Sequence, residues 1–317
     1  MKVRQSAAMD RRLKVLASAQ GGVFTTDDAA SVGVSSNELG TLARQRVVTR
    51  IRRSAYVLTG VLAAAGPDEQ YRLRVLAILR SRPGTDRASH QSALALFGIA
   101  FFGAPRNVVE AESRTGAQTC RGGLRLHEPT PALGVRFGAI RSVTAAVACV
   151  QVAARYGFEA GVCAMDSALH LQASTTADLE QSVEQLATRR HAGVRRAIAA
   201  AEPTTESVGE SRTRIILRDA GFSVTPQFVV MDGRHQVGRV DFLVDECVIV
   251  DFDGLIKYEG ADGKFALAAE KDRESRLTRL GFEVVRIVWS DLEDPVAIVH
   301  RVLTAKRTAG KRRAWMR

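Results

Sequence analysis

The most constraining feature of the sequence is a change of hydrophobic period after residue 202, from helical spacing to extended runs. Three runs rich in β-branched and aromatic residues lie between two helical segments, and a fourth run follows the second of these. In order, the segments are SVGESRTRIILRDAGF (helix), SVTPQFVVM, QVGRVDFLV and CVIVDFDG (strands), KFALAAEKDRESRLTRLG (helix) and FEVVRIVW (strand). We therefore expect an αβββαβ core in the last third of the chain.

Two of the predicted strands carry acids at positions that are normally apolar. Asp241 lies in the second strand, and Asp251 and Asp253 end the third. With a tight turn at Asp245-Glu246 and pairing centred on residue 246, Asp241 lies opposite or nearly opposite Asp251 on one face. Carboxylates this close repel each other, and a divalent cation or a raised pKa relieves the repulsion. The alternative is a strand that ends at a solvated Asp-Gly turn, and a one-residue change of register also separates the acids.

Four motifs in this region, in the same order, carry a family resemblance. GESRTRIILRDAGF, GRVDFLV, VIVDFDG and EKDRESRLTRLGFEVVRIVWSDL resemble the very-short-patch-repair-like branch of the PD-(D/E)XK nucleases, over about residues 205–300. The resemblance implies a restriction-endonuclease-like fold and a DNA endonuclease that depends on Mg²⁺ or Mn²⁺. It assigns Glu210 as the helix acid that supports the metal or its water, Asp241 as the metal-binding aspartate, and Asp251 as the second acid.

The chain departs from the simplest form of that motif at residue 253. Asp253 stands where the plain motif has lysine, as is usual in this branch, so Lys257 or Lys271 is expected to supply the positive charge. Arg273 and Arg276 resemble the basic residues of the following helix and are expected to contact DNA. The segment after Asp-Gly is LIKY, without the histidine that relatives often carry. A degenerate domain that only binds DNA is therefore the alternative.

The first 60 residues have the pattern of a winged helix-turn-helix. DRRLKVLASAQ repeats apolar residues at helical spacing before a Gly-Gly pair, and two further helices are expected in TTDDAASVG and SSNELGTLARQR. Thr26 and Asp27 are candidate N-caps for the second helix, and Ser35-Ser36 with Glu38 form a candidate capping box for the third. VVTRIRRSAYVLTG is typical of a small hairpin.

Positive charge gathers at the end of the third helix and in the hairpin. The five arginines concerned are Arg44, Arg46, Arg50, Arg52 and Arg53. In this geometry the recognition helix enters the major groove and basic wing residues neutralise phosphates, so we expect these arginines to bind double-stranded DNA. The formal net charge of +11 also favours a polyanionic partner, either nucleic acid or an anionic membrane surface. The alternatives are a solvated basic face and a protein-contact module.

Residues 10–60 resemble the N-terminal winged-helix domain of the AbiEi antitoxin family. The resemblance continues in ASHQSALALFGI and in SVTAAVACVQVAARYGFEAGVCAMDSALH. It implies autoregulation of an operon, a role in phage defence and a toxin or defence partner protein. His90, which opens an apolar helix, is expected to be a cap or a hydrogen-bonded core residue without a chemical role.

The predicted fold class is a multidomain α/β and α+β protein. Between the two ends we expect a scaffold with a long helix at 68–82, β-like runs in RNVVEAES, GLRLHE and VRFGAI, and three or four helices up to about residue 200. The expected regions are a winged helix-turn-helix (1–62), an AbiEi-like mixed α/β scaffold (63–202), a PD-(D/E)XK nuclease-like domain (203–304) and a basic tail (305–317), which we expect to be disordered.

Cysteine usage and hydropathy favour a soluble cytoplasmic protein. The four cysteines lack metal-ligand spacing and are expected to be free, buried thiols. The start lacks the pattern of a signal peptide, and the most apolar stretch falls well short of the roughly 20 residues that span a membrane. The sequence therefore predicts a DNA-binding, metal-dependent endonuclease, and the alternative is a non-enzymatic, antitoxin-type transcriptional regulator with a degenerate nuclease domain.

Overall fold

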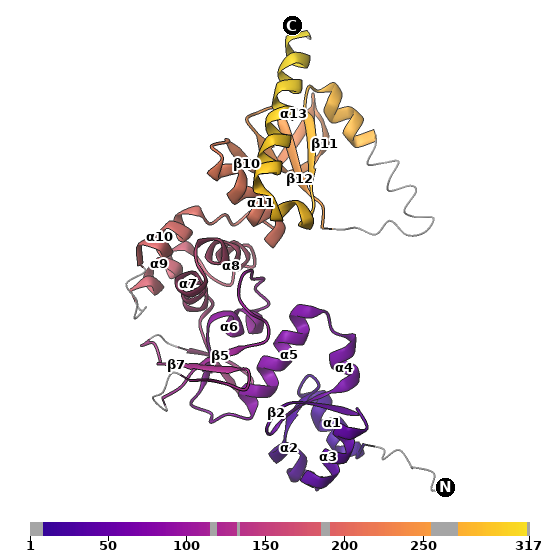
Figure 1. Ribbon diagram of the computed structural model, residues 1–317, viewed down its shortest axis with the longest axis vertical. Coiled ribbons are helices and arrows are strands. Elements are labelled where there is room, and N and C mark those ends of the chain that lie inside the picture. The colour runs from indigo at the N-terminus through magenta and orange to yellow at the C-terminus, as the bar shows by residue number, and fades with distance from the viewer. Residues whose placement is uncertain (1–8, 115–118, 132–133, 185–190, 255–271, 316–317) are drawn as a thin grey trace, which may run out of the picture. The chain divides into compact units, whose positions relative to one another are not determined.

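The computed structural model describes residues 9–114, 119–131, 134–184, 191–254 and 272–315. The chain forms two compact units, Met1–Ala200 and Ala201–Arg317, and both are mixed α/β structures (Figure 1). The predicted boundary at residue 62 lies inside the first unit. Within the described ranges, no helix is both long and apolar enough to cross a membrane.

The first unit begins with what we call the N-terminal module, residues 11–58. Its elements are α1 (Arg11–Ala19), β1 (Val23–Thr25), α2 (Thr26–Ser31), α3 (Ser36–Arg44), β2 (Val48–Arg52) and β3 (Ala55–Leu58). The strands form an antiparallel sheet in the order β1-β3-β2. Leu13, Phe24, Leu39, Leu42 and Val48 are buried together, so the module has a core of its own. The predicted three helices and hairpin are therefore present.

Local capping explains where the helices of the N-terminal module begin. The Ser35 hydroxyl accepts a hydrogen bond from the backbone N–H of Glu38 (3.3 Å), and the Glu38 carboxylate accepts one from the backbone N–H of Ser35 (2.7 Å). This confirms the predicted capping box. The cap of α2 is Thr25 and not Thr26 or Asp27, because Thr25 and Asp28 form a second capping box one residue earlier than expected.

The remainder of the first unit, which we call the scaffold, contains a six-stranded sheet in the order β6-β7-β5-β4-β9-β8. Its elements are α4 (Thr59–Ala64), α5 (Pro67–Arg80), β4 (Arg87–Ala88), α6 (His90–Phe97), β5 (Val109–Glu112), β6 (Thr119–Arg121), β7 (Leu124–His127), β8 (Gly134–Phe137), β9 (Ile140–Val143), α7 (Ala145–Tyr156), α8 (Phe158–His170), α9 (Thr176–Val183) and α10 (His191–Ala200). Helix α5 joins the two parts of this unit, since Leu73 and Ala77 pack against Val23 and Val57 of the module.

One predicted run of the scaffold spans two strands. VRFGAI crosses from β8 to β9, which form an antiparallel hairpin, because Gly138 adopts a positive φ of 58° and turns the chain. The four cysteines are free, but Cys120 is exposed and not buried as expected.

The second unit contains a four-stranded sheet in the order β10-β11-β12-β13, antiparallel for the first two pairs and parallel for the last. Its elements are α11 (Val208–Asp219), β10 (Val224–Asp232), β11 (His235–Val244), β12 (Val248–Phe252), a helical segment over 272–279, β13 (Glu283–Ile287), a 3₁₀ helix (Trp289–Glu293) and α13 (Pro295–Trp315). The described elements thus follow the predicted order of helix, three strands, helix and strand.

The expected disordered tail is instead the second half of α13, which runs along the sheet (Figure 1). Ile298, Val302 and Ala309 are buried in the core of the second unit at helical spacing. Lys306 and Arg312 form ion pairs with Asp245 (2.6 Å) and Glu283 (2.7 Å). The prediction of disorder was wrong because it rested on the many basic residues, whereas a sparse apolar stripe between them anchors this helix.

Candidate functional site

The basic residues of the N-terminal module are mostly exposed. Arg44, Arg46, Arg50 and Arg53 are exposed, and Arg52 is half-buried. Among the residues that the structure describes, no acid forms an ion pair with any of the five. Their charges therefore face the solvent without compensation from the protein, as a surface that attracts polyanions requires.

Helix α3 has a polar outer face that the sequence interpretation missed. Leu39 and Leu42 point into the core, whereas Asn37, Thr41 and Arg44 lie on the opposite side at spacings of four and three residues. The Arg44 guanidinium donates to the Thr41 hydroxyl (2.9 Å), and that hydroxyl donates to the Asn37 carbonyl (3.1 Å). In the sequence, the signal for this face is the spacing of Asn37, Thr41 and Arg44, which places them on one side of a helix.

Arg52 lies close to the scaffold. A Cβ atom added to Gly122, in the turn between β6 and β7, would lie 3.7 Å from Arg52 Nε. Burial lowers the pKa of Arg52, and the positive charges of Arg82 and Arg121 lower it further. Arg52 is therefore less free than Arg50 and Arg53 to reach a separate partner.

The second unit places Asp241 and Asp251 across from each other, in the predicted register. The ladder between β11 and β12 pairs Phe242 with Val250 and Val244 with Val248, so the pairing is centred on residue 246. The strands are joined by the three residues 245–247; Asp245 and Glu246 adopt positive φ angles of 45° and 60°, and the Cys247 N–H donates to the Val244 carbonyl (3.1 Å).

The Asp241 and Asp251 carboxylates are held by backbone groups of the opposite strand. The Asp241 Oδ2 atom accepts the backbone N–H of Phe252 (2.7 Å), and Asp251 Oδ1 accepts the backbone N–H of Asp241 (3.1 Å). Arg273 donates to the other oxygen of Asp251 (2.7 Å). Asp251 therefore has a cationic partner, whereas the hydrogen bond to Asp241 comes from an uncharged group.

Of the two carboxylates, Asp241 is consequently the less stabilised in its charged form. Burial raises its pKa to about 7; the N–H of Phe252 opposes this rise, and the negative charges of Glu210, Asp251 and Glu206 add to it. At neutral pH this carboxyl binds a proton for part of the time. A cation placed beside it would favour the charged form.

Glu210 comes to this cluster from the first turn of α11. Its carboxylate accepts hydrogen bonds from the backbone N–H of Glu206 (3.1 Å) and from Gln227 Nε2 (3.0 Å). The start of α11 lies tightly against β12, because a Cβ atom at Gly209 would lie 2.1 Å from the Phe252 ring. Gln227, which has a positive φ of 49°, and Gly209 were not predicted, since their roles depend on this tertiary approach.

The remaining predicted residues are less closely connected to the cluster. Arg276 is exposed and pairs with Asp272 one turn away (2.7 Å). Asp253 donates its backbone N–H to Ile287 (2.7 Å), and its Oδ1 atom is buried without a hydrogen-bond partner among the described residues. Lys257 and Lys271 lie outside the described residues.

The oxygen-rich donor set fits a hard cation in chemistry and charge. Asp241 lies near several other negative charges, and within the described part of the chain Asp253 has a buried carboxylate oxygen without a hydrogen-bond partner. However, Glu210, Asp241 and Asp251 do not form a group whose ligand atoms all lie within 4.8 Å of one another; in the described ranges, His90, Glu110 and His127 do. The acidic cluster as a metal site therefore stays a prediction.

The histidine group is explained by hydrogen bonding within the scaffold. The buried Glu110 accepts hydrogen bonds from His127 Nε2 (2.7 Å), Arg125 (2.6 Å) and the Tyr156 hydroxyl (2.6 Å). His90 stacks on His127 at a centroid distance of 4.3 Å, and burial lowers the pKa of His90 to about 3. The Arg125 charge offsets Glu110 and would repel a cation. His90 is buried and its Nδ1 atom lies 3.1 Å from the Ser89 hydroxyl, as expected for a hydrogen-bonded core histidine. Its lack of a chemical role stays a prediction.

Comparison with known proteins gives one family match. A family model described as "Transcriptional regulator, AbiEi antitoxin" matches residues 11–59, which are the N-terminal module and the start of α4. No curated protein matches the chain.

Proposed function

We propose that this protein is a DNA-binding transcriptional regulator of the antitoxin kind and that its N-terminal module is a winged helix-turn-helix. The observation that carries the proposal is a group of exposed arginines with no acidic partner among the described residues, on the segment that matches the AbiEi regulator family. A toxin as protein partner belongs to the same proposal, because the family description names an antitoxin.

The recognition element is the outer face of α3. In the major groove, an asparagine such as Asn37 can pair with adenine and an arginine such as Arg44 can pair with guanine, while Thr41 suits either donors or acceptors. Arg50 and Arg53, in the hairpin that forms the wing, are suited to phosphate contacts. Base contacts would supply specificity, and phosphate contacts would supply affinity.

A binding assay with two variants separates these roles. Fluorescence anisotropy would compare a duplex from upstream of the protein's own coding sequence with a random duplex of equal length. We expect Asn37→Ala/Thr41→Ala to reduce the preference for the upstream duplex. We expect Arg50→Gln/Arg53→Gln to weaken both duplexes about tenfold or more. The control is Arg72→Gln/Arg195→Gln, which removes the same charge from exposed, ion-paired sites of the same unit.

We propose a second candidate function for the second unit, which is hydrolysis of DNA phosphodiesters by a restriction-endonuclease-like domain. The order of its elements and the raised pKa of Asp241 support this candidate. Asp241, Asp251 and Glu210 would hold Mg²⁺ or Mn²⁺, which would supply an acidified water and stabilise charge on the phosphodiester. Arg273 lies beside Asp251, where it would offset the negative charge of a bound phosphate.

The nuclease candidate is tested by cleavage and by metal binding. Plasmid DNA would be incubated with the wild type or with Asp241→Ala in Mg²⁺ or Mn²⁺, and thermal unfolding would be followed with and without each metal. The candidate predicts cutting and metal-dependent stabilisation for the wild type alone. Absence of both in the wild type would leave the second unit as a non-catalytic module.

A further inference from the structure

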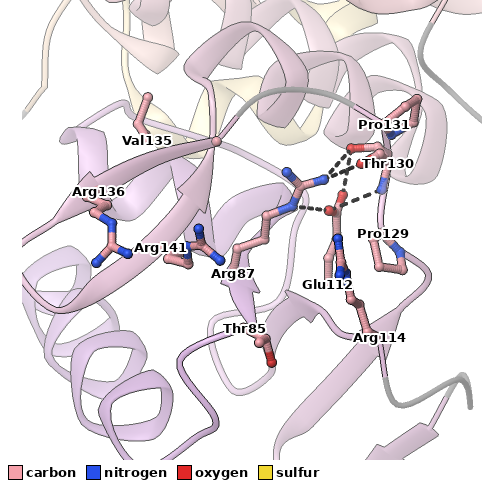
Figure 2. A pocket seen from close by; sticks show the side chains of 11 residues that line it. Thr85, Arg87, Glu112, Arg114, Pro129, Thr130, Pro131, Val135, Arg136 and Arg141 are labelled. Atoms are coloured by element: carbon pink, nitrogen blue, oxygen red, sulfur yellow. Dashed lines mark hydrogen bonds and ion pairs between the residues drawn. The ribbon is translucent and has the colours of Figure 1, made fainter.

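The scaffold has a positively charged cavity whose lining residues are not among those proposed to bind DNA. Its volume is about 390 Å³, and it opens beside strands β4, β5, β8 and β9 (Figure 2). The charged residues that line it are Arg87, Glu112, Arg114, Arg136 and Arg141. Pro129 and Pro131 provide apolar surface on its wall.

Strand pairing places three of these arginines in a row. Arg87 pairs with Arg141 across β4 and β9, and Arg141 pairs with Arg136 across β9 and β8. Residues directly opposite on neighbouring strands share one face, with Cβ atoms about 4.5–5.5 Å apart, and like charges at this separation are destabilising. Figure 2 shows Arg136, Arg141 and Arg87 in that order across the cavity.

The acid at one end of the row compensates only the nearest arginine. Glu112 pairs with Arg87 in register, and its Oε2 atom accepts a hydrogen bond from Arg87 Nε (2.5 Å). Thr130 and Gln151 also donate to Glu112, through the Thr130 N–H (3.2 Å) and hydroxyl (3.1 Å) and the Gln151 amide (2.7 Å). Arg87 further donates to the carbonyl and hydroxyl oxygens of Thr130. Glu112 is therefore fully engaged and neutralises Arg87.

The other arginines keep their charge. Arg114, Arg136 and Arg141 are exposed, and no described acid forms an ion pair with them. The cavity therefore carries an excess of about three positive charges, one per arginine. A bound anion with several negative charges would attract both guanidinium groups and so offset the cross-strand repulsion between Arg136 and Arg141.

We propose that this cavity binds a small polyphosphate ester, of the nucleoside triphosphate class. Guanidinium groups form paired hydrogen bonds with phosphate oxygens, and the charge of a triphosphate matches the excess on the wall. The volume lies within the range of roughly 300–1,000 Å³ typical of small-molecule pockets, and a concave pocket of this size favours a small ligand over a duplex. Pro129 and Pro131, which also line the cavity, offer apolar surface to a sugar or base.

Calorimetric titration of the full chain tests the proposal. The probes are ATP, GTP, inorganic tripolyphosphate, adenosine and a single-stranded oligonucleotide. The proteins are the wild type, Arg136→Gln/Arg141→Gln, and the control Arg72→Gln/Arg195→Gln, which loses the same charge outside the cavity. We expect the nucleoside triphosphates to bind the wild type and the control within twofold of each other, and to bind the cavity variant at least tenfold more weakly.

The probes also identify which part of the ligand is recognised. Adenosine should not bind, and tripolyphosphate should bind more weakly than ATP or GTP if the apolar wall contributes. Equal binding of the triphosphates to all three proteins would overturn the proposal, as would a cavity variant that loses affinity for the oligonucleotide alone.

Thermal unfolding without ligand checks that the cavity variant folds. Its melting temperature should equal or exceed that of the wild type, because removing two opposed like charges relieves repulsion. A folded variant with unchanged triphosphate affinity would count against the site.

Discussion

The N-terminal module and the acidic cluster of the second unit both gather like charges, but they do so in opposite environments. Arg44, Arg46, Arg50 and Arg53 are exposed, so water and salt screen their repulsion at little cost to folding. Asp241 is half-buried near other acids, and its pKa rises to about 7 in response. An exposed charged side chain is stabilised by water and remains available to a partner. A carboxylate removed from water must instead be protonated, paired or bound to a cation.

The largest effect is expected where α11 packs against β12, because this contact brings Glu210 to the acidic cluster. Gly209→Ala places a methyl group into the Phe252 ring, so we expect it to lower the free energy of unfolding of the second unit by about 3 kcal/mol. Both tryptophans, Trp289 and Trp315, belong to that unit, so tryptophan fluorescence in a urea titration reports its unfolding.

The matched control for this change is Gly310→Ala. Gly310 lies in α13, where an added Cβ would meet no atom within 4 Å. We expect this variant to be stabilised by about 0.5–1 kcal/mol, because alanine favours the helix. Equal effects of the two substitutions would show that α11 does not lie against β12 as described.

The buried acid predicts a pH dependence of stability. The pKa of Asp241 is about 7 in the folded protein, against 3.8 as its ordinary value, so between these values the folded state binds more protons than the unfolded state. Stability therefore falls as pH rises through this window. We expect a loss of about 1–3 kcal/mol for the wild-type second unit, and a smaller loss for Asp241→Asn, measured by urea titration at pH 5 and pH 8. Equal pH dependence in the two proteins would contradict the assignment.

The smallest expected effect belongs to the N-terminal cap of α3. Ser35→Ala removes the acceptor of the Glu38 N–H, so we expect it to cost about 1 kcal/mol in the stability of the N-terminal module. Hydrogen exchange of the α3 amides measures this local change without needing tryptophan. Ser31→Ala is the control, because Ser31 lies at the end of α2 and caps no helix start. Equal protection of α3 in both variants would contradict the role of the cap.

The sequence predicted the features that local interactions determine. The Ser35–Glu38 capping box, the helices of the N-terminal module and the register of Asp241 against Asp251 depend on neighbours in the chain or on one tight turn. Their spacing could therefore be recognised without knowing the tertiary structure.

Features that depend on distant segments were missed. The arginine row of the scaffold requires β4, β8 and β9 to be adjacent, and the positions of Gly209 and Gln227 depend on how α11 meets the sheet. The anchoring of α13 was missed for another reason, since its apolar stripe is sparse and mixed with many basic residues. No pattern within a single segment distinguishes these arrangements from solvated surface.

The most direct test of the central claim is the salt dependence of DNA binding. We predict that the logarithm of the association constant of the wild type falls linearly with the logarithm of salt concentration. For Arg50→Gln/Arg53→Gln, this slope should be smaller by about 2, because two phosphate contacts are lost. The Arg72→Gln/Arg195→Gln control should keep the wild-type slope. An unchanged slope and affinity in the Arg50→Gln/Arg53→Gln variant would contradict the assignment of this face to DNA.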